Sequence, residues 1–98
     1  MKPVIGLDVA KGKSVFQAFL KRNEAHGKSE TITHTEDGFR RLGNVIQELY
    51  RQTGEEPVVV MEATGHYHRA VEAFLLSNKI PHFIINPLVS KRSKNAQL

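Results

Sequence analysis

The hydrophobic pattern of this 98-residue chain first changes its period after His34. Before that point, short apolar and β-branched runs are separated by polar residues, which is typical of β-strands. The pattern predicts strands at Val4–Val9, Val15–Leu20 and Ser29–His34, with a polar turn at Lys21–Gly27. Because the connections are short, we expect the three strands to form an antiparallel meander.

A helical period begins directly after His34. Apolar residues then recur at spacings of three and four, which predicts an amphipathic helix that ends at Gly54. Thr35 is placed to cap this helix, and the acidic residues Glu36 and Asp37 suit the positive end of its dipole. The apolar positions are Phe39, Leu42, Ile46, Leu49 and Tyr50.

Two further strands and a second helix complete the pattern. Pro57–Glu62 is apolar on both faces, which is typical of a central strand parallel to its neighbour, and His82–Asn86 has the same character. A helix that ends at Asn78 is predicted between them, and the sequence after Pro87 permits another. The apolar positions of the predicted helix are Tyr67, Ala70, Val71, Phe74 and Leu75.

The element order is therefore β-β-β-α-β-α-β, an α/β fold with a mixed sheet covered by helices. Right-handed crossovers would place the strands at Val58 and Phe83 on the same side of the first strand. The length suits one domain, residues 1–98, and there is no internal repeat or linker.

Composition excludes several classes of protein. The absence of cysteine rules out a disulfide framework and a cysteine-based zinc site. The N-terminus has no apolar signal region, and no apolar run approaches the ~20 residues that a membrane span needs. We therefore expect a cytoplasmic protein without membrane attachment.

The charge distribution favours a polyanionic partner, although a solvated basic surface explains it equally well. The formal net charge is +4, and no carboxylate follows Glu72. The basic residues of that last stretch are Lys79, Lys91, Arg92 and Lys94.

Asp8 and Glu62 are the candidate catalytic and metal-binding residues. Each lies near the end of a predicted apolar strand, and parallel neighbouring strands would bring both carboxylates to the same carboxyl edge, where open α/β sheets bind ligands. Two close carboxylates repel each other unless a cation lies between them, and Mg²⁺ prefers oxygen ligands. The pair thus indicates a metal site for phosphoryl transfer, whereas the simpler alternative is a turn cap and a solvated loop residue.

Three stretches, "GLDVAK", "EATGHYHRAVEAFLL" and "INPLVSK", occur here in an order and spacing that resemble a known family. The chain is similar to the N-terminal domain of the DEDD-type transposases of bacterial insertion sequences (the insertion-sequence 110 family), a group that includes the Piv/MooV DNA invertases. The resemblance covers nearly the whole chain. It implies a ribonuclease-H-like fold close to that of the Holliday-junction resolvase RuvC.

The family uses four acidic residues, Asp-Glu-Asp-Asp, to hold divalent metal ions, and the resemblance maps the first two onto Asp8 and Glu62. The other two are expected shortly after the "INPLVSK" stretch, but no acidic residue follows Glu72. We therefore expect a C-terminally truncated fragment that lacks the second acidic pair and the family's serine-containing C-terminal domain. The resemblance implies a parent that cleaves and joins DNA with Mg²⁺ or Mn²⁺, together with a structured guide RNA and as a homo-oligomer. The fragment alone should be inactive.

Several other residues have both a functional and a plain structural interpretation. Lys11, Lys13 and Tyr67 could contact nucleic acid, or they could be a basic turn and a packing residue. Thr64 and Gly65 suit a helix cap and a tight turn. The basic residues near the C-terminus are further candidate contacts or a solvated face: Lys91, Arg92 and Lys94.

Two alternative functions remain from the sequence alone. "GLDVAKGKS" loosely resembles the phosphate loop of actin-like ATPases and sugar kinases, but those loops need a glycine and hydroxyl residues directly after the aspartate. The chain could also be a non-catalytic nucleic-acid-binding or dimerisation module. An ATP-binding measurement separates the first alternative from the transposase interpretation.

Overall fold

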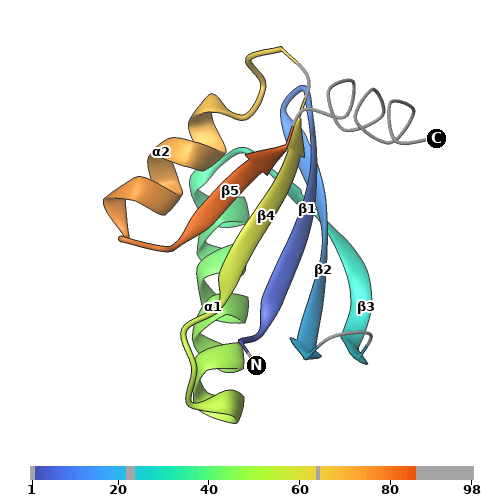
Figure 1. Cartoon of the computed structure of the whole chain (residues 1–98). Coiled ribbons are helices and arrows are strands. Elements are labelled where there is room, and N and C mark those ends of the chain that lie inside the picture. The colour runs from blue at the N-terminus through green and yellow to red at the C-terminus, as the bar shows by residue number, and fades with distance from the viewer. Residues whose placement is uncertain (1, 22–23, 64, 86–98) are drawn as a thin grey trace, which may run out of the picture.

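The computed structural model describes residues 2–21, 24–63 and 65–85, and its elements follow the predicted order (Figure 1). One sheet has the strand order β3-β2-β1-β4-β5, antiparallel from β3 to β1 and parallel from β1 to β5. Both later strands therefore lie on the same side of β1, as the crossover rule predicted. The elements are β1 (Val4–Ala10), β2 (Lys13–Lys21), β3 (Glu24–Thr33), α1 (Glu36–Thr53), β4 (Val58–Ala63), α2 (Arg69–Ser77) and β5 (His82–Ile85).

The third strand is longer than the sequence predicted. β3 begins at Glu24 and not at Ser29, so most of the predicted polar turn is strand. Its polar residues pair with β2 through the backbone, which needs no apolar side chain, and the pairing shifts register twice. The Gln17 side-chain amide donates to the Gly27 carbonyl oxygen at 3.0 Å, within the irregular stretch of β3.

Helix α1 begins and ends where its caps were predicted. Thr35 is the N-cap, and its hydroxyl accepts a hydrogen bond from the Gly38 amide at 3.3 Å. Gly54 adopts the left-handed conformation and its amide donates to the Tyr50 carbonyl at 2.8 Å. Tyr50 was predicted on the apolar face but is 54% exposed, because it lies about 100° around the helix from buried Leu49.

Helix α2 begins at Arg69, later than the predicted cap at Thr64 indicated, and it does not include Tyr67, the first apolar position of the predicted helix. Its N-cap is His68, whose side chain makes no capping hydrogen bond, and Gly65 has a positive φ of 63° in the preceding turn. Thr64, the predicted cap, lies outside the described residues. The strand-to-helix connection is therefore longer than the hydrophobic period indicated.

The two parallel strands β4 and β5 differ in position. β4 is a central strand, as predicted, and it lies between β1 and β5, with Val59 and Met61 fully buried. β5 is a four-residue strand at the edge of the described sheet, and its Phe83 is 64% exposed, because it pairs with Val60 and so faces the side of the sheet away from the helices. The segment predicted to continue after Pro87 falls in residues 86–98, outside the described part.

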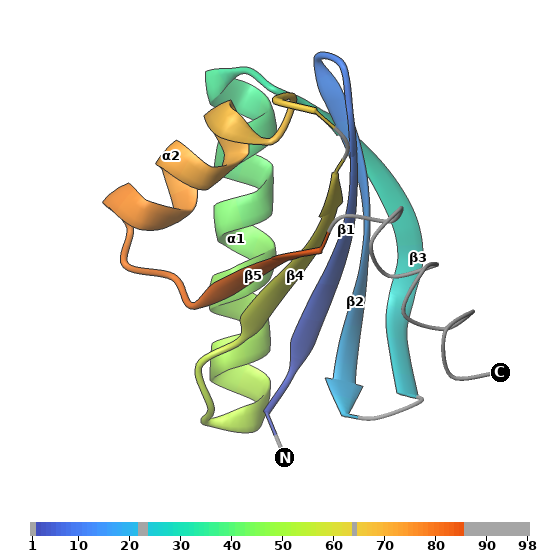
Figure 2. The ribbon, with the colours of Figure 1, turned by 45° about the horizontal axis from the view of Figure 1, so that its top comes forward.

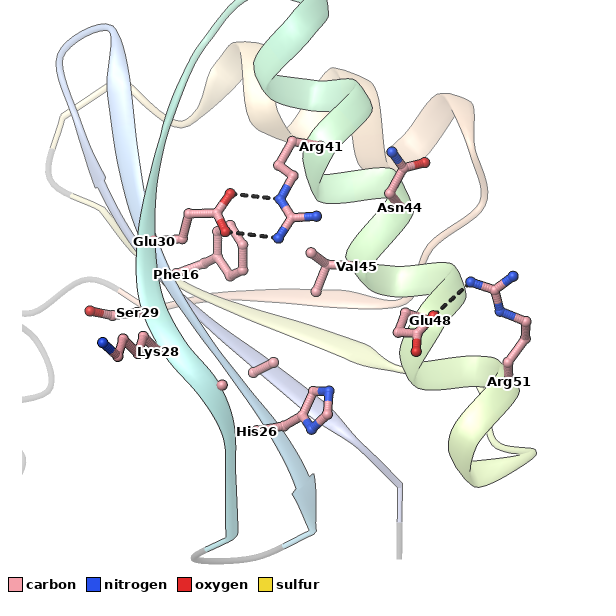
Figure 3. A pocket seen from close by; sticks show the side chains of 12 residues that line it. Phe16, His26, Lys28, Ser29, Glu30, Arg41, Asn44, Val45, Glu48 and Arg51 are labelled. Carbon is pink, nitrogen blue, oxygen red and sulfur yellow. Dashed lines mark hydrogen bonds and ion pairs between the residues drawn. The ribbon is translucent and has the colours of Figure 1, made fainter.

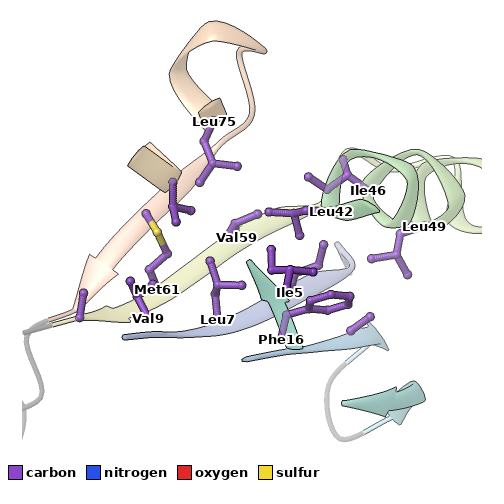
Figure 4. Packing of buried hydrophobic residues seen from close by; sticks show 14 residues of the cluster. Ile5, Leu7, Val9, Phe16, Leu42, Ile46, Leu49, Val59, Met61 and Leu75 are labelled. Atoms are coloured by element: carbon purple, nitrogen blue, oxygen red, sulfur yellow. The ribbon is translucent and has the colours of Figure 1, made fainter. Parts of the chain in front are cut away.

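The hydrophobic core lies between the sheet and its two described helices, which both cover the same face (Figures 2 and 4). Alternate strand residues point into this core, as the period of two requires. Neither of these helices is long and apolar enough to cross a membrane. The core residues are Ile5, Leu7, Val9, Phe16, Ala18, Ile32, Leu42, Ile46, Leu49, Val59, Met61, Ala63, Val71 and Leu75.

Candidate functional site

Two carboxylates stand on neighbouring strands near their carboxyl ends. Asp8 of β1 is the register partner of Glu62 of β4, on strands about 4.8 Å apart. The residues before them, Leu7 and Met61, point toward the helices and are buried. Because side chains alternate along a strand, Asp8 and Glu62 face the opposite, open side of the sheet, where both are exposed.

A hollow of about 330 Å³ on this open face includes both carboxylates in its wall. Gly6, two residues before Asp8, contributes no side chain, and a Cβ built there would meet only the Gln17 carbonyl oxygen, at 4.0 Å. Val15 and Val60 form apolar parts of the wall. The carboxylate pair is therefore accessible from solvent, with space beside it for a hydrated ion or a phosphate group.

The chemistry of this pair suits a hard divalent cation. Carboxylate oxygens are ligands that Mg²⁺ and Mn²⁺ accept, and Mg²⁺ commonly keeps several waters beside one or two protein carboxylates. Within residues 2–21, 24–63 and 65–85, no three histidine, aspartate or glutamate side chains come together to hold a metal ion. The described site therefore offers a pair of ligands, Asp8 and Glu62, to one hydrated ion.

The β1–β2 hairpin brings two lysines to the same end of the sheet. Its turn is Lys11-Gly12, and Gly12 has the positive φ of 73° that this tight connection needs. Lys13 lies two residues before Val15, the antiparallel partner of Asp8, so its side chain leaves the sheet on the carboxylate face. Lys11 and Lys13 are both exposed beside the acidic pair.

The connection after Glu62 carries two aromatic rings. Tyr67 is 39% exposed, and its ring lies 5.0 Å from that of His66, at a tilt of 41°. Because α2 begins at Arg69, Tyr67 lies in the turn before the helix. The predicted contacts Lys91, Arg92 and Lys94 lie outside the described residues.

A second hollow of about 410 Å³ lies on the helix side of the sheet, between β3 and α1 (Figure 3). Arg41 binds the Glu30 carboxylate through two hydrogen bonds of 2.7 and 2.9 Å, and Arg51 contacts Glu48 at 2.6 Å. The hydrogen bonds from Arg41 hold the pKa of Glu30 below its usual value, and Glu30 raises the pKa of Arg41. These arginines already have carboxylate partners. Sequence reasoning missed the Glu30–Arg41 pair, because no periodicity relates residues of β3 and α1.

A comparison with protein families gives a match that covers nearly the whole chain. The family model described as Transposase, for the DEDD transposases of insertion sequence 110, matches residues 5–98. No curated protein gives a significant match. The match includes both carboxylates of the open face.

Solved structures with a similar fold include RuvC from T. thermophilus in complex with a Holliday junction substrate. It has 14% sequence identity and a TM-score of 0.53, over 94% of this chain and 69% of that chain. A second T. thermophilus RuvC structure has 13% identity and a TM-score of 0.47, with 87% of this chain and 64% of that chain covered. YeaZ from Pseudomonas aeruginosa has 12% identity and a TM-score of 0.47, with 88% and 44% covered. The likeness to the first structure confirms the ribonuclease-H-like, RuvC-like fold class.

Proposed function

The chain belongs to the DEDD transposase family of insertion sequence 110, and we propose that it forms part of the catalytic core of a DNA transposase or recombinase. In this proposal Asp8 and Glu62 are metal-binding catalytic residues of an enzyme that cleaves and joins DNA. The observation that carries the proposal is their pairing in register on the open sheet face. The RuvC-like fold and the family match support it.

Asp8 and Glu62 would hold Mg²⁺ or Mn²⁺ through carboxylate oxygens. A bound ion of this kind stabilises charge on phosphate oxygens and lowers the pKa of a bound water. The chain's own contribution is to fix two carboxylates on adjacent rigid strands and to leave the hollow beside them open. Lys11 and Lys13, at the same edge, would contact the phosphate backbone of DNA, and Tyr67 would stack on a base or pack against the backbone.

The complete reaction needs more ligands than this pair. Two metal ions repel each other, so both can be held only by several carboxylates. We assign the remaining acidic ligands to another part of the full-length parent protein. That parent would act on DNA in the bacterial cytoplasm as a homo-oligomer, with a structured guide RNA.

The ATPase alternative receives less support from the hairpin. Only Lys11 and Gly12 separate β1 from β2, and the first hydroxyl residue, Ser14, is fully buried. A phosphate loop requires accessible amides and hydroxyls directly after the aspartate. A nucleic-acid-binding module without catalysis remains the expected behaviour of this chain alone.

Metal binding tests the proposal directly. Mn²⁺ titration of the ¹⁵N-labelled chain should broaden the amide signals around Asp8 and Glu62 before those of other regions, because broadening depends on distance from the ion. Asp8→Asn and Glu62→Gln should each weaken this effect by about tenfold or more. Glu36→Gln and Asp37→Asn, which remove carboxylates in the first turn of α1, serve as matched controls. Equal broadening at all carboxylates, unchanged in Asp8→Asn, would contradict a specific site.

A further inference from the structure

Ser14 is the one buried polar side chain within the described ranges, with no exposed surface. It lies on β2, directly after the hairpin that carries Lys11 and Lys13. Its hydroxyl oxygen lies 2.7 Å from Nε2 of His34, a residue of the β3–α1 connection. A polar group at this depth is costly unless it is hydrogen-bonded, so this contact is needed for the local fold.

His34 contacts the hairpin at a second point. Its backbone amide donates to the Gly12 carbonyl oxygen at 3.0 Å. The two contacted residues, Gly12 and Ser14, lie on either side of Lys13. Because Ser14 points into the core, alternation directs Lys13 to the open face, beside Asp8.

The direction of the Ser14–His34 hydrogen bond follows from the need of the buried Ser14 hydroxyl proton for an acceptor. Within the described residues the Ser14 hydroxyl has this single side-chain partner. If the imidazole donated, the buried hydroxyl proton would be left without an acceptor, whereas donation by Ser14 to Nε2 uses that proton. The imidazole is then neutral, with its proton on Nδ1. Burial, which lowers the pKa of His34, favours the same neutral form.

Aromatic packing holds the His34 ring from its other side. The ring stacks on Phe39 of α1, with centroids 6.0 Å apart and an interplanar angle of 13°. Phe39 in turn stacks on Phe74 of α2, at 5.2 Å and 12°. The imidazole is therefore held between Phe39 of α1 and the hairpin, and its orientation does not depend on the hairpin alone.

We propose that Ser14 and His34 form a latch that fixes the β1–β2 hairpin, so that Lys11 and Lys13 stay beside the Asp8–Glu62 edge. His34 is then a positioning residue of the nucleic-acid site, which it does not itself contact. The functional consequence rests on the proposed function, because only a phosphate-binding site gains from fixed lysines there. The latch itself rests on the contacts of Ser14, His34 and Gly12.

Two variants remove the latch in different ways. His34→Phe keeps a ring against Phe39 but has no nitrogen for Ser14, and Ser14→Ala removes the hydroxyl. His26→Phe is the matched control, because His26 lies on β3, the strand that directly precedes His34, and its ring is hydrogen-bonded to Gln52, at 3.4 Å, and not to the β1–β2 hairpin in the described structure. All variants are compared with the unmodified chain by hydrogen exchange and by ¹⁵N spectroscopy.

In the latch variants, the amide hydrogens of Lys13 and His34 should exchange about tenfold faster, while those of the central strand residue Val59 change by less than about twofold. The ¹⁵N shifts of the His34 ring should show an unprotonated, hydrogen-bonded Nε2 in the unmodified chain, and Ser14→Ala should shift that signal. His26→Phe should change neither measurement. Unchanged exchange in the hairpin, equal acceleration in all strands, or a protonated Nε2 would overturn the latch.

A DNA-binding measurement then tests whether the Ser14–His34 latch positions Lys13. Lys13→Ala alone should weaken binding of a short DNA duplex. In a chain that also carries His34→Phe, Lys13→Ala should weaken binding by a smaller factor, because a mobile hairpin no longer holds Lys13 in position to contact phosphate. Equal factors in both backgrounds would overturn the role of the latch in positioning Lys13. If the unmodified chain binds no DNA, the proposed function fails, while the exchange and ring-nitrogen data still decide whether the latch exists.

Discussion

Asp8 and Glu62 are register partners on two parallel strands, and both stand on the sheet face opposite the two described helices. This relationship places two negative charges at the carboxyl ends of β1 and β4, without any other acidic side chain close enough to complete a three-ligand site in the described part of the chain. The arrangement suits weak binding of one hydrated cation.

We expect the chain to be catalytically inert alone, because two carboxylates cannot hold two metal ions against their mutual repulsion. The measurement is incubation of the purified chain with supercoiled DNA and Mg²⁺ or Mn²⁺, beside the Asp8→Asn variant. No nicking is expected from either protein. Nicking that disappears in Asp8→Asn would show that fewer acidic ligands are sufficient.

The chain should bind DNA or RNA weakly, with little sequence preference, and affinity should fall steeply between roughly 50 and 200 mM salt. Substituting both Lys11 and Lys13 by glutamine should weaken binding and reduce the slope of log affinity against log salt by about 1–2. Lys2→Gln is the matched control, because this exposed lysine precedes β1 at the other end of the sheet. Fluorescence anisotropy with a labelled oligonucleotide measures both quantities. An equal effect of Lys2→Gln would mean that binding is diffuse.

Gly38→Ala should destabilise the fold. A Cβ at Gly38 would overlap the Thr33 carbonyl oxygen and lie 2.9 Å from its carbonyl carbon, so the start of α1 must move away from β3. The expected net loss is roughly 2 kcal/mol of unfolding free energy, after the gain in helix propensity.

Gly43→Ala is the control for that prediction, because Gly43 is also in α1. Its Cβ would meet the Phe74 ring at 3.6 Å, an ordinary contact, so a gain of about 0.5–1 kcal/mol is expected. Urea unfolding followed by circular dichroism measures both variants. If the two substitutions have the same sign, the close approach of Gly38 to Thr33 is not a stability determinant.

Stability should decrease on acidification in a way that depends on His34. Burial lowers the pKa of His34 from its ordinary value of 6.5, so the folded state binds a proton less readily than the unfolded state. This contribution is fully present above pH 6.5 and is lost as the pH falls through the folded-state pKa. The urea midpoint should therefore fall between about pH 7.5 and about pH 5, and by less in His34→Phe. An equal fall in both proteins would assign the acid sensitivity to other groups.

Local signals in the sequence determined the element order and the limits of α1. Thr35 and Gly54 act within a few residues of their own positions, through a side-chain cap and a left-handed terminus, so one sequence is enough to predict them. The same signals misplaced the start of α2 and of β3. Tyr67 has helical spacing but lies in the preceding turn, and Glu24 lies in a strand that is held by backbone pairing and not by apolar side chains.

The sequence by itself placed Asp8 and Glu62 near the ends of two strands, which made them candidates for one site. Only the tertiary structure decided that β1 and β4 are neighbours, and in a register that sets these two residues opposite each other. It also decided the Ser14–His34 hydrogen bond and the Glu30–Arg41 pair. Register depends on how the whole sheet and its helices share one core, since a shift of one residue would turn every side chain of a strand to the other face.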